Sequence, residues 1–491
     1  MRRSWIHVGL SATLTWSTVG WTQTPPPSPP AEAPPGASSE LVKSVAGGLT
    51  AEQVGRRAAT TSYSAKASQE SLQAAAARAD TAFANFLPRL SGTARYTRLS
   101  DLTPPTLGGG NLVGTSAPGG TVNPGPPKYT NMSTPFAFSF PIFLNNYSLQ
   151  ASIAVPISDY FLRINEGYSA ATHARDAAEF DALAAKARAS ADGKIAFYSW
   201  LRARGSTVVA TRSLQDQRTH LKDARNQFSV GNASKADVLR AETGEAAAEL
   251  AVERTANLAE LAEAQVRIAL HTGQEERLLP GENLEINPVP MAGNMKQLVN
   301  EALANRYEVK SLDANLLATR RQTALARASH YPQLVGVGNV TYANPNQRLI
   351  PSQDKWFGTW DVTAQLTWSP NDNVSATSQV SEAIARTRAL EAQRMALRDG
   401  IELEVTQAFL AVREADFALD STRRQLASAV EALRVAEELF RNGRATATLV
   451  ADAETDLTMS RLQALNAMVD ARVGRVRLEH ALGRDVQVLS H

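Results

Sequence analysis

The 491-residue sequence contains no cysteine. Disulfide bonds, thiolate metal sites, thiol catalysis and a lipid-modified N-terminal cysteine are therefore excluded. Aromatic residues are also scarce, at 6% of the chain, whereas alanine is abundant. This composition suits long, slender helices better than a thick globular core, so an elongated protein is predicted.

Neither sign of charge is in excess. The formal net charge is +2, and basic residues are mixed with acidic ones along the helical segments. No basic face for nucleic acid results, so a nucleic-acid partner is not predicted. Long apolar runs are missing too: beyond the N-terminal segment no stretch reaches the about 18 residues that a transmembrane helix needs.

Patterns of catalysis and metal binding are absent as well. His173, His220 and His271 fall in helical segments without a second ligand at i+4. The sequence has no Gly-x-Ser-x-Gly, P-loop or His-Glu-x-x-His motif. It predicts neither an enzyme nor a cofactor or metal site.

The N-terminus has the order of a secretory signal. Arg2 and Arg3 precede a mildly apolar stretch, residues 8–21, which ends in small residues. Residues 1–22 are predicted to be a signal peptide, and residues 23–48 a proline-rich spacer that neither forms a helix nor packs. The alternative is a disordered cytosolic tail, because the apolar stretch contains several Thr and Ser and lacks an Ala-x-Ala cleavage site.

The most informative feature that is present is a repeated motif. Segment 227–233 returns at 439–445, and each copy lies between two long helical patterns. The central residues of the two copies are Gly231, Asn232 and Ala233, and Gly443, Arg444 and Ala445.

A second repeated segment pairs residues 87–90 with residues 331–334, and a strand-like run follows each. Together the repeated segments indicate a tandem duplication with repeats at 49–280 and 281–491. Each repeat is predicted to contain a helix, two strands and a long helical hairpin. Such a unit usually leaves a face that only its copy or another subunit can bury.

Two long runs without proline, 157–279 and 371–491, permit uninterrupted helices, and each breaks once at the repeated glycine. Each run therefore predicts a hairpin with a long arm of about 70 residues, roughly 105 Å, and a short arm of about 37. Arms this slender need neighbouring subunits for stability. A coiled-coil seam with a seven-residue period is formed in the second copy by Val405, Val412, Leu419, Leu426, Leu433 and Phe440, and in the first by Leu214, Leu221 and Phe228.

The material between the helices has the period of two that is typical of strands, at 90–97, 147–155, 334–342 and 360–368. A strand of about 10 residues, aromatic at its ends, apolar on one face and polar on the other, is the pattern of an outer-membrane barrel. A soluble sheet on a packed core is the alternative. In the last run the apolar face consists of Trp360, Val362, Ala364, Leu366 and Trp368.

Four strands cannot close a barrel, and open strand edges are not tolerated in lipid. Two or three chains would close it. About eight strands leave an interior filled by side chains, whereas larger barrels open a channel. Three chains are therefore favoured if the barrel is a conduit.

The order and duplication of these features resemble the TolC-like outer-membrane efflux protein family over about residues 49–485. The resemblance rests on the duplicated strand pair, on the hairpins broken at Phe-x-x-Gly (Phe228 and Phe440), and on segments 87–90 and 331–334 before the strands. It implies a mainly α fold with a membrane β-barrel. That fold is a trimeric twelve-stranded barrel in the outer membrane of a Gram-negative bacterium, continuing into a periplasmic α-helical tunnel.

The resemblance also implies function and partners. The protein would be a passive exit duct of a tripartite efflux or type I secretion system. Its partners would be two further copies of itself, outer-membrane lipid, a periplasmic adaptor (membrane fusion) protein and an inner-membrane pump of the RND or ABC type. Segment 102–135 would be an enlarged cell-surface loop.

Site residues follow from the same resemblance. The adaptor would contact the hairpin tips, Gly231, Asn232, Ala233, Gly443, Arg444 and Ala445. Asp452 would correspond to one of two acidic rings that narrow the closed end of the tunnel, while Leu449 occupies the position of the other. In the alternative interpretation the tip residues only form turns, and Asp452 only complements a helix dipole.

A rival prediction from another class is a soluble or periplasmic coiled-coil scaffold or adaptor without channel activity. The seven-residue repeats alone fit this scaffold as well as they fit a channel. An adaptor should show one hairpin flanked by lipoyl-like and barrel segments, whereas this chain shows two hairpins and two strand pairs.

Overall fold

The computed structural model describes residues 45–101, 142–273, 275–289 and 293–485. The predicted signal peptide, nearly all of the spacer and the 102–135 loop lie outside these residues. The first set of elements is α1 (Ala51–Thr61), α2 (Tyr63–Ala84), β1 (Arg89–Arg98), β2 (Asn145–Val155), α3 (Ile157–Asp159), the π-helical turn η1 (Tyr160–Ile164), α4 (Asn165–Ser229) and α5 (Lys235–Leu270). The second set is α6 (Met295–Asn305), α7 (Tyr307–Arg327), the 3-10 turn η2 (Ala328–His330), β3 (Gln333–Asn344), β4 (Phe357–Thr367), α8 (Asp372–Arg441) and α9 (Ala447–Ala481).

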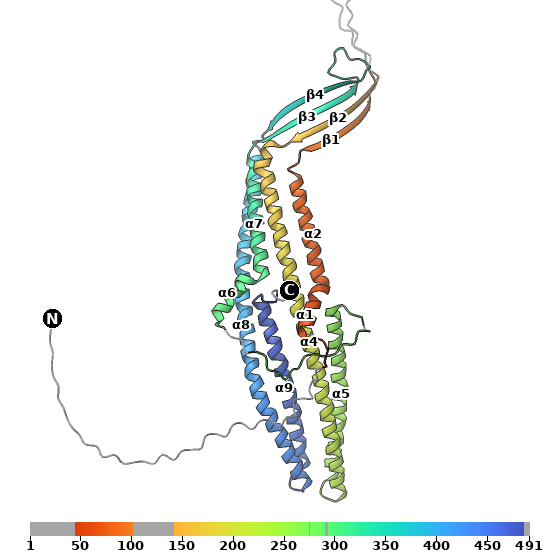
Figure 1. Cartoon of the computed structure of the whole chain (residues 1–491), viewed down its shortest axis with the longest axis vertical. Coiled ribbons are helices and arrows are strands. Elements are labelled where there is room, and N and C mark those ends of the chain that lie inside the picture. Colours follow the sequence, from red (N-terminus) through yellow and green to blue (C-terminus); the bar gives the residue numbers. More distant parts are fainter. Residues whose placement is uncertain (1–44, 102–141, 274, 290–292, 486–491) are drawn as a thin grey trace, which may run out of the picture.

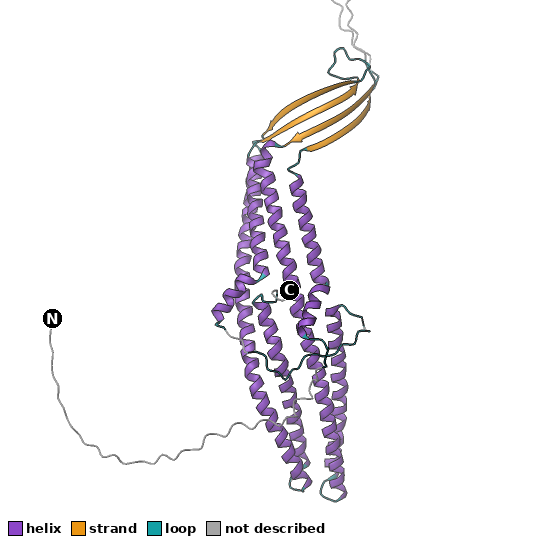
Figure 2. Ribbon diagram, viewed as in Figure 1, coloured by secondary structure: helices purple, strands orange, loops and turns teal. Residues whose placement is uncertain are grey.

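The molecule is elongated, with the sheet at one end and two helical turns at the other (Figures 1 and 2). Helix α4 is the central helix: it contacts α1, α2 and α7 as well as α5 and α9. Helices α4 and α5 form one antiparallel hairpin, and α8 and α9 form the other. Both hairpins turn at the end of the molecule farthest from the sheet.

The four strands form one antiparallel sheet in the order β1-β2-β3-β4, which leaves β1 and β4 as its edges. The four predicted strands are confirmed, and most extend by one to three residues beyond the predicted ends. Trp360 and Val362 on β4 are 73% and 77% exposed. The sheet therefore has an apolar face that no described part of the chain covers.

Each hairpin has one long and one short arm, as predicted. Helices α4 and α8 contain 65 and 70 residues, and α5 and α9 contain 36 and 35. Among the described residues, no helix combines the length and the hydropathy needed to cross a bilayer.

The seam of the second hairpin is largely buried, whereas that of the first differs near its tip. Phe440 is 6% exposed, but Phe228, which the repeat places at the equivalent position, is 46% exposed. The reason is that the second hairpin lies against α4, where the His220 ring is 5.8 Å from that of Phe440. The expectation that Phe228 belongs to a buried seam is therefore wrong for the single chain.

The largest apolar cluster lies where α1, α4, α5 and α9 meet, and it includes Phe197, Trp200, Leu201, Val266, Leu270 and Leu465. Gly205 lets α4 and α9 approach closely, because a Cβ there would lie 2.7 Å from the terminal carbons of Leu465. The core thus fixes how one hairpin sits on the other.

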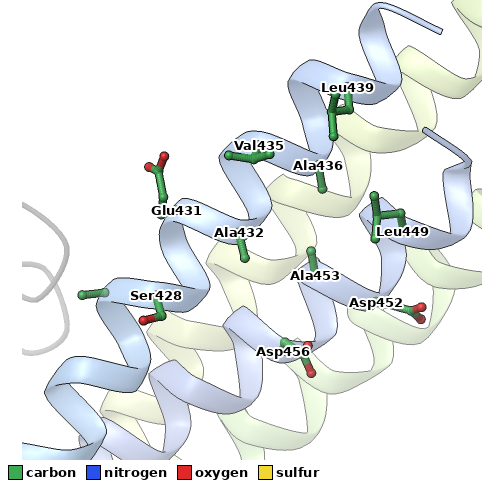
Figure 3. A pocket seen from close by; sticks show the side chains of 11 residues that line it. Ser428, Glu431, Ala432, Val435, Ala436, Leu439, Leu449, Asp452, Ala453 and Asp456 are labelled. Atoms are coloured by element: carbon green, nitrogen blue, oxygen red, sulfur yellow. The ribbon is translucent and has the colours of Figure 1, made fainter. Parts of the chain in front are cut away.

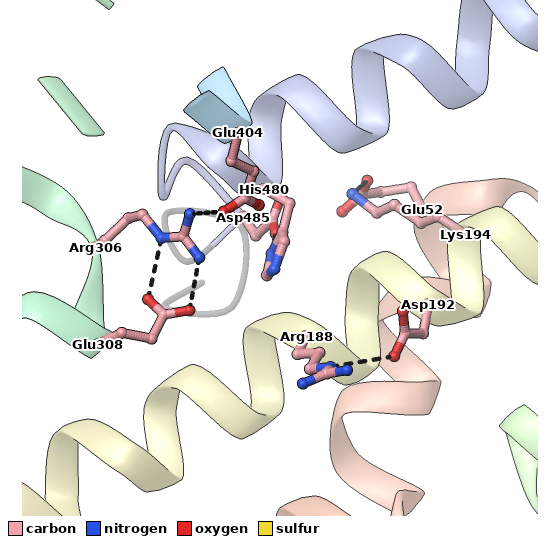
Figure 4. Close-up of polar contacts among 9 residues, drawn as sticks. All are labelled: Glu52, Arg188, Asp192, Lys194, Arg306, Glu308, Glu404, His480 and Asp485. Atoms are coloured by element: carbon pink, nitrogen blue, oxygen red, sulfur yellow. Dashed lines mark hydrogen bonds and ion pairs between the residues drawn. The ribbon is translucent and has the colours of Figure 1, made fainter. Parts of the chain in front are cut away.

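Ion pairs hold the short helices onto this frame (Figure 4). Arg306, which is 7% exposed between α6 and α7, pairs with Glu308 at 2.9 Å and with Glu404 of α8. Lys194 of α4, 4% exposed, pairs with Glu52 of α1 at 2.6 Å. Because breaking a buried pair leaves an uncompensated charge, these contacts fix the positions of α1 and α6.

Candidate functional site

The two hairpin tips have the same backbone geometry. Gly231 and Gly443 have φ values of +82° and +67°, in the left-handed region that favours glycine. Asn232 N donates to Gln227 O at 2.9 Å and Gly231 N to Phe228 O at 3.1 Å. In the second tip the corresponding bonds, from Arg444 to Leu439 and from Gly443 to Phe440, are 2.8 and 3.0 Å. Both ends are Schellman motifs, which satisfy the last carbonyls of α4 and α8.

The next helices begin directly after these turns. Ser234 caps α5: its side chain accepts from Asp237 N, and the Asp237 carboxylate accepts from Ser234 N at 2.9 Å. The Ser234 hydroxyl, which donates to Asp237 Oδ2 at 2.7 Å, lowers the pKa of Asp237, and the bond from Ser234 N adds to the effect. In the second tip Thr446 holds the capping position without a side-chain bond. Gly231, Asn232, Gly443 and Arg444 are exposed, and Ala233 and Ala445 are half-buried.

Contacts between the two hairpins join the tips into one surface. Gln227 Nε2 donates to Arg441 O at 3.3 Å, and Arg441 Nε lies 3.1 Å from Asp223 Oδ2. Arg240 of α5 donates to Thr448 Oγ1 of α9 at 2.9 Å. The two turns that contain the six predicted tip residues lie side by side at the end of the molecule farthest from the sheet (Figure 1).

A groove of about 780 Å³ lies between α8 and α9, next to the second tip on the side toward the sheet (Figure 3). Its α9 side carries Leu449, Asp452 and Asp456, and its α8 side carries Glu431, Val435 and Leu439 among small residues. Leu449 is 46% exposed. The groove is thus mainly apolar, with two carboxylates on its α9 side and, on its α8 side, Glu431, which pairs with Arg434 at 2.6 Å.

Asp452 is exposed and has no hydrogen bond or ion pair with any described residue. It is the sixth residue of α9, which has no acidic residue in its first turn. The helix-dipole interpretation is weakened accordingly, because that effect falls off within one turn. Asp456, which follows on the same helix face, is not among the predicted site residues; its i+4 spacing from Asp452 is the signal that could have identified it.

A buried polar contact lies between the two hairpins, one helical turn after Val450 in α9. Glu454 of α9 and His220 of α4 are 4% and 6% exposed, and Glu454 Oε1 lies 3.9 Å from His220 Nδ1. Gln217 Nε2 donates to Glu454 Oε2 at 2.7 Å. Nearby, Arg461 Nη1 lies 2.9 Å from Asp216 Oδ2. Sequence reasoning treated His220 as isolated and did not single out Glu454.

Burial changes the proton affinity of both groups. It raises the pKa of Glu454 to about 7, and the negative charges of Asp216 and Glu437 add to the effect. Burial lowers the pKa of His220, although Asp223 and Asp237 act in the opposite sense. The contact between the hairpins is therefore sensitive to pH in the neutral range.

Among the described residues, no group of three or more His, Asp or Glu is arranged to hold a metal ion. The tips consist of glycine turns with exposed polar side chains, and the groove carries carboxylates. Exposed turns of this kind can bind a protein partner, and exposed carboxylates can attract cations.

The geometry defines a class of protein in which a β-sheet with an exposed apolar face continues into long helical hairpins. The sequence model of the outer membrane efflux protein family matches residues 56–273 and 298–484. The chain belongs to the outer membrane efflux protein family, whose members are outer-membrane channels.

Solved channels have the same fold. The outer-membrane channel OprN is 20% identical, with a TM-score of 0.69 over 95% of this chain and 98% of its own. CmeC of Campylobacter jejuni is 14% identical, with a TM-score of 0.72 over 88% and 85%. MtrE of Neisseria gonorrhoeae, described in its open state, is 18% identical, with a TM-score of 0.70 over 88% of each chain. These likenesses confirm the predicted fold class, β-barrel strands continued by an α-helical tunnel. No curated protein matches the sequence significantly.

Gly443→Val is expected to loosen the second tip. A Cβ at residue 443 would have open space, so the cost is backbone strain alone, about 1–2 kcal/mol and more for a β-branched side chain. Trypsin cleavage after Arg444 should accelerate roughly tenfold, because cleavage follows the population of the open tip. Gly400→Ala, in the exposed interior of α8, is the control and should leave this rate unchanged. Equal cleavage of Gly443→Val and wild type would contradict the assigned turn geometry.

Glu454→Gln is expected to change how stability depends on pH. Between pH 4.5 and about 7 the folded protein keeps a proton on Glu454 that the unfolded chain releases. Stability therefore falls as the pH rises through this window, by about 3 kcal/mol. The glutamine variant should melt above wild type at pH 8 and near it at pH 5.

Thermal unfolding of the detergent-solubilised protein from pH 5 to 8 measures this difference. His220 contributes in the opposite sense, because its lowered pKa favours the folded state at higher pH. Both proteins contain His220, so the difference in melting temperature between wild type and Glu454→Gln at each pH reports the contribution of Glu454. Asp456→Asn, at an exposed carboxylate of the same helix, is the matched control. Parallel curves for wild type and Glu454→Gln would disprove the assignment.

Proposed function

We propose that this protein is the outer-membrane exit duct of a tripartite efflux or type I secretion system. One observation carries the proposal: a four-stranded sheet with two free edges and an exposed apolar face continues into two helical hairpins of great length. A soluble scaffold has no use for such a face. In a bilayer the face contacts lipid, and the hairpins extend away from the membrane into the periplasm.

Three copies close the structure. Edge β1 of one copy pairs with edge β4 of the next, so three sheets of four strands make a twelve-stranded barrel without free edges. A barrel of this size leaves an open lumen, whereas one built from two copies is filled by its side chains. The polar face of each sheet then lines the lumen.

The partners follow from the two ends of the molecule. Lipid of the outer membrane surrounds the barrel. At the other end, the surface formed by Gly231, Asn232, Ala233, Gly443, Arg444 and Ala445 contacts a periplasmic adaptor, which connects the duct to an inner-membrane pump of the RND or ABC type. Transport through the duct is passive, and the pump supplies the energy.

The proposed function predicts a conducting trimer. The full chain is expressed in a Gram-negative host, and the outer membrane is extracted and run unboiled and boiled on a denaturing gel. An oligomer of three chains that dissociates on heating, and that conducts in planar bilayers, is the expected result. A soluble, non-conducting species would contradict the proposal and favour the coiled-coil scaffold.

Asp452 is proposed to form a carboxylate ring where the tunnel narrows. Three carboxylates around one axis favour cations and bind multivalent ones. Asp452→Ala should weaken block by hexaamminecobalt(III) about tenfold in planar bilayers, whereas Leu449→Asp, which adds a carboxylate one turn earlier, should strengthen it. Block that is unchanged in both variants would show that neither position faces the ion path.

A further inference from the structure

The strand register assigns every described strand residue to one of two faces, because directly opposed residues of antiparallel strands point to the same side. Leu90 lies opposite Ile153, Gly338 opposite Val362, and Val340 opposite Trp360. These residues form the exposed apolar face. The other face carries, on the two edge strands, Arg89, Ser91, Thr93, Arg95 and Thr97 of β1 and Phe357, Thr359, Asp361, Thr363, Gln365 and Thr367 of β4.

The charges on this polar face are unequal. Arg89 and Arg95 are exposed and make no hydrogen bond or ion pair with any described residue. The one acidic residue among the face's described strand positions, Asp361, is already engaged: Arg348 Nη2 lies 2.7 Å from Asp361 Oδ1, and Asn339 Nδ2 donates to Asp361 Oδ2 at 2.9 Å. With Arg348 of the loop between β3 and β4, three guanidinium groups thus accompany the one carboxylate on the strand positions of this face. The same loop also contains Asp354 and Lys355.

Carboxylates at the base of the barrel do not correct this excess. Arg89 lines a cavity of about 480 Å³ where the sheet meets the helices, together with Asp159 and Arg163. Arg163 Nη1 lies 2.7 Å from Asp159 Oδ1, so that carboxylate already has a cationic partner. The Arg89 guanidinium therefore remains without a counter-charge in the cavity.

Closing the barrel does not correct the excess either. The described inner-face positions of β4, which meets β1 of the next copy, offer Asp361 as their acidic residue. If Arg95 pairs with the neighbour's Asp361, Arg348 loses that partner, and the ratio of three guanidinium groups to one carboxylate is unchanged. In sequence, the connection between β1 and β2 contains one residue of each sign, Asp101 and Lys128, so it leaves the excess unchanged.

We infer that the barrel lumen selects for anions, and that the solutes this duct passes include organic anions bearing carboxylate, phosphate or sulfate groups. Arg89 and Arg95 determine this selectivity. The inference rests on the proposed function, because it requires three sheets closed around a conducting lumen. Clefts of one charge sign with low-dielectric walls focus the field and raise the local concentration of counter-charged solutes. The positive lumen then lies at the opposite end of the molecule from the Asp452 carboxylate.

A polyanion tests the inference. The full-length protein is reconstituted in planar bilayers in 0.1 M KCl, and sodium tripolyphosphate is added to each compartment in turn. Wild-type conductance should fall on addition to one of them, and raising KCl to 1 M should weaken the block by screening. The double variant Arg89→Gln, Arg95→Gln should need at least about tenfold more tripolyphosphate for the same block.

Controls separate charge from structure. Arg89→Lys with Arg95→Lys keeps the charge and should keep the block. Arg98→Gln removes a guanidinium at the strand end, where it donates to Asn145, and should leave the block unchanged. Thr93→Arg adds a guanidinium to the polar face and should strengthen the block, a test that needs no arginine to be removed.

The outcomes distinguish this inference from the function on which it rests. A wild-type pore that conducts without tripolyphosphate block, or a glutamine double variant blocked as strongly as wild type, overturns the inference and leaves the duct intact. A Thr93→Arg pore blocked no more strongly than wild type also overturns it. A wild-type protein that forms no pore contradicts the duct, and the inference with it.

Discussion

Every feature of this molecule depends on one constraint: a strand edge cannot remain unpaired in lipid. The sheet has two such edges, on β1 and β4, and its outer face is apolar along all four strands. The chain is therefore incomplete alone. In the proposed trimer, closure by further copies determines which face lines the lumen, and it places the hairpins side by side below the barrel. An assembly is thus a condition for the fold to exist in a membrane.

Contacts within a hairpin and contacts between hairpins differ in kind. The α8–α9 hairpin is held along its length by apolar seam residues such as Leu433 and Val450. Toward the tips, α4 meets the other hairpin through polar groups: Gln217 with Glu454, Asp216 with Arg461, and Asp223 with Arg441. Polar groups can exchange protein partners for water at little net cost, whereas apolar seams cannot. Near the tips each hairpin is therefore a stiffer unit than the pair, whereas the apolar cluster around Trp200 and Leu465 joins the hairpins farther up. Protonation of Glu454 acts at the polar part of this junction.

The strands, the hairpins and their turns could be predicted because their signals are local. A period of two marks the strands, a period of seven marks the helix seams, and Gly231 and Gly443 mark the turns. The missed features depend on residues far apart in sequence. Glu454 and its partner Gln217 are separated by 237 residues. Which residues of β4 share a face with Arg95 depends on the strand register, and the exposure of Phe228 depends on which helix lies beside it. The register of one strand on another and the neighbours of a helix are tertiary properties that no local pattern encodes.

The Schellman geometry at the tips has a consequence for how this protein can change over evolutionary time. The two turns are closed by backbone N–H and C=O groups and by glycine, so their shape does not depend on the side chains that follow. The side chain of Arg444 makes no contact that such a turn requires. Residues after the glycine can thus be replaced without refolding the tip. If the tips contact an adaptor, as proposed, a few surface substitutions would suffice to change the partner while the architecture stays fixed.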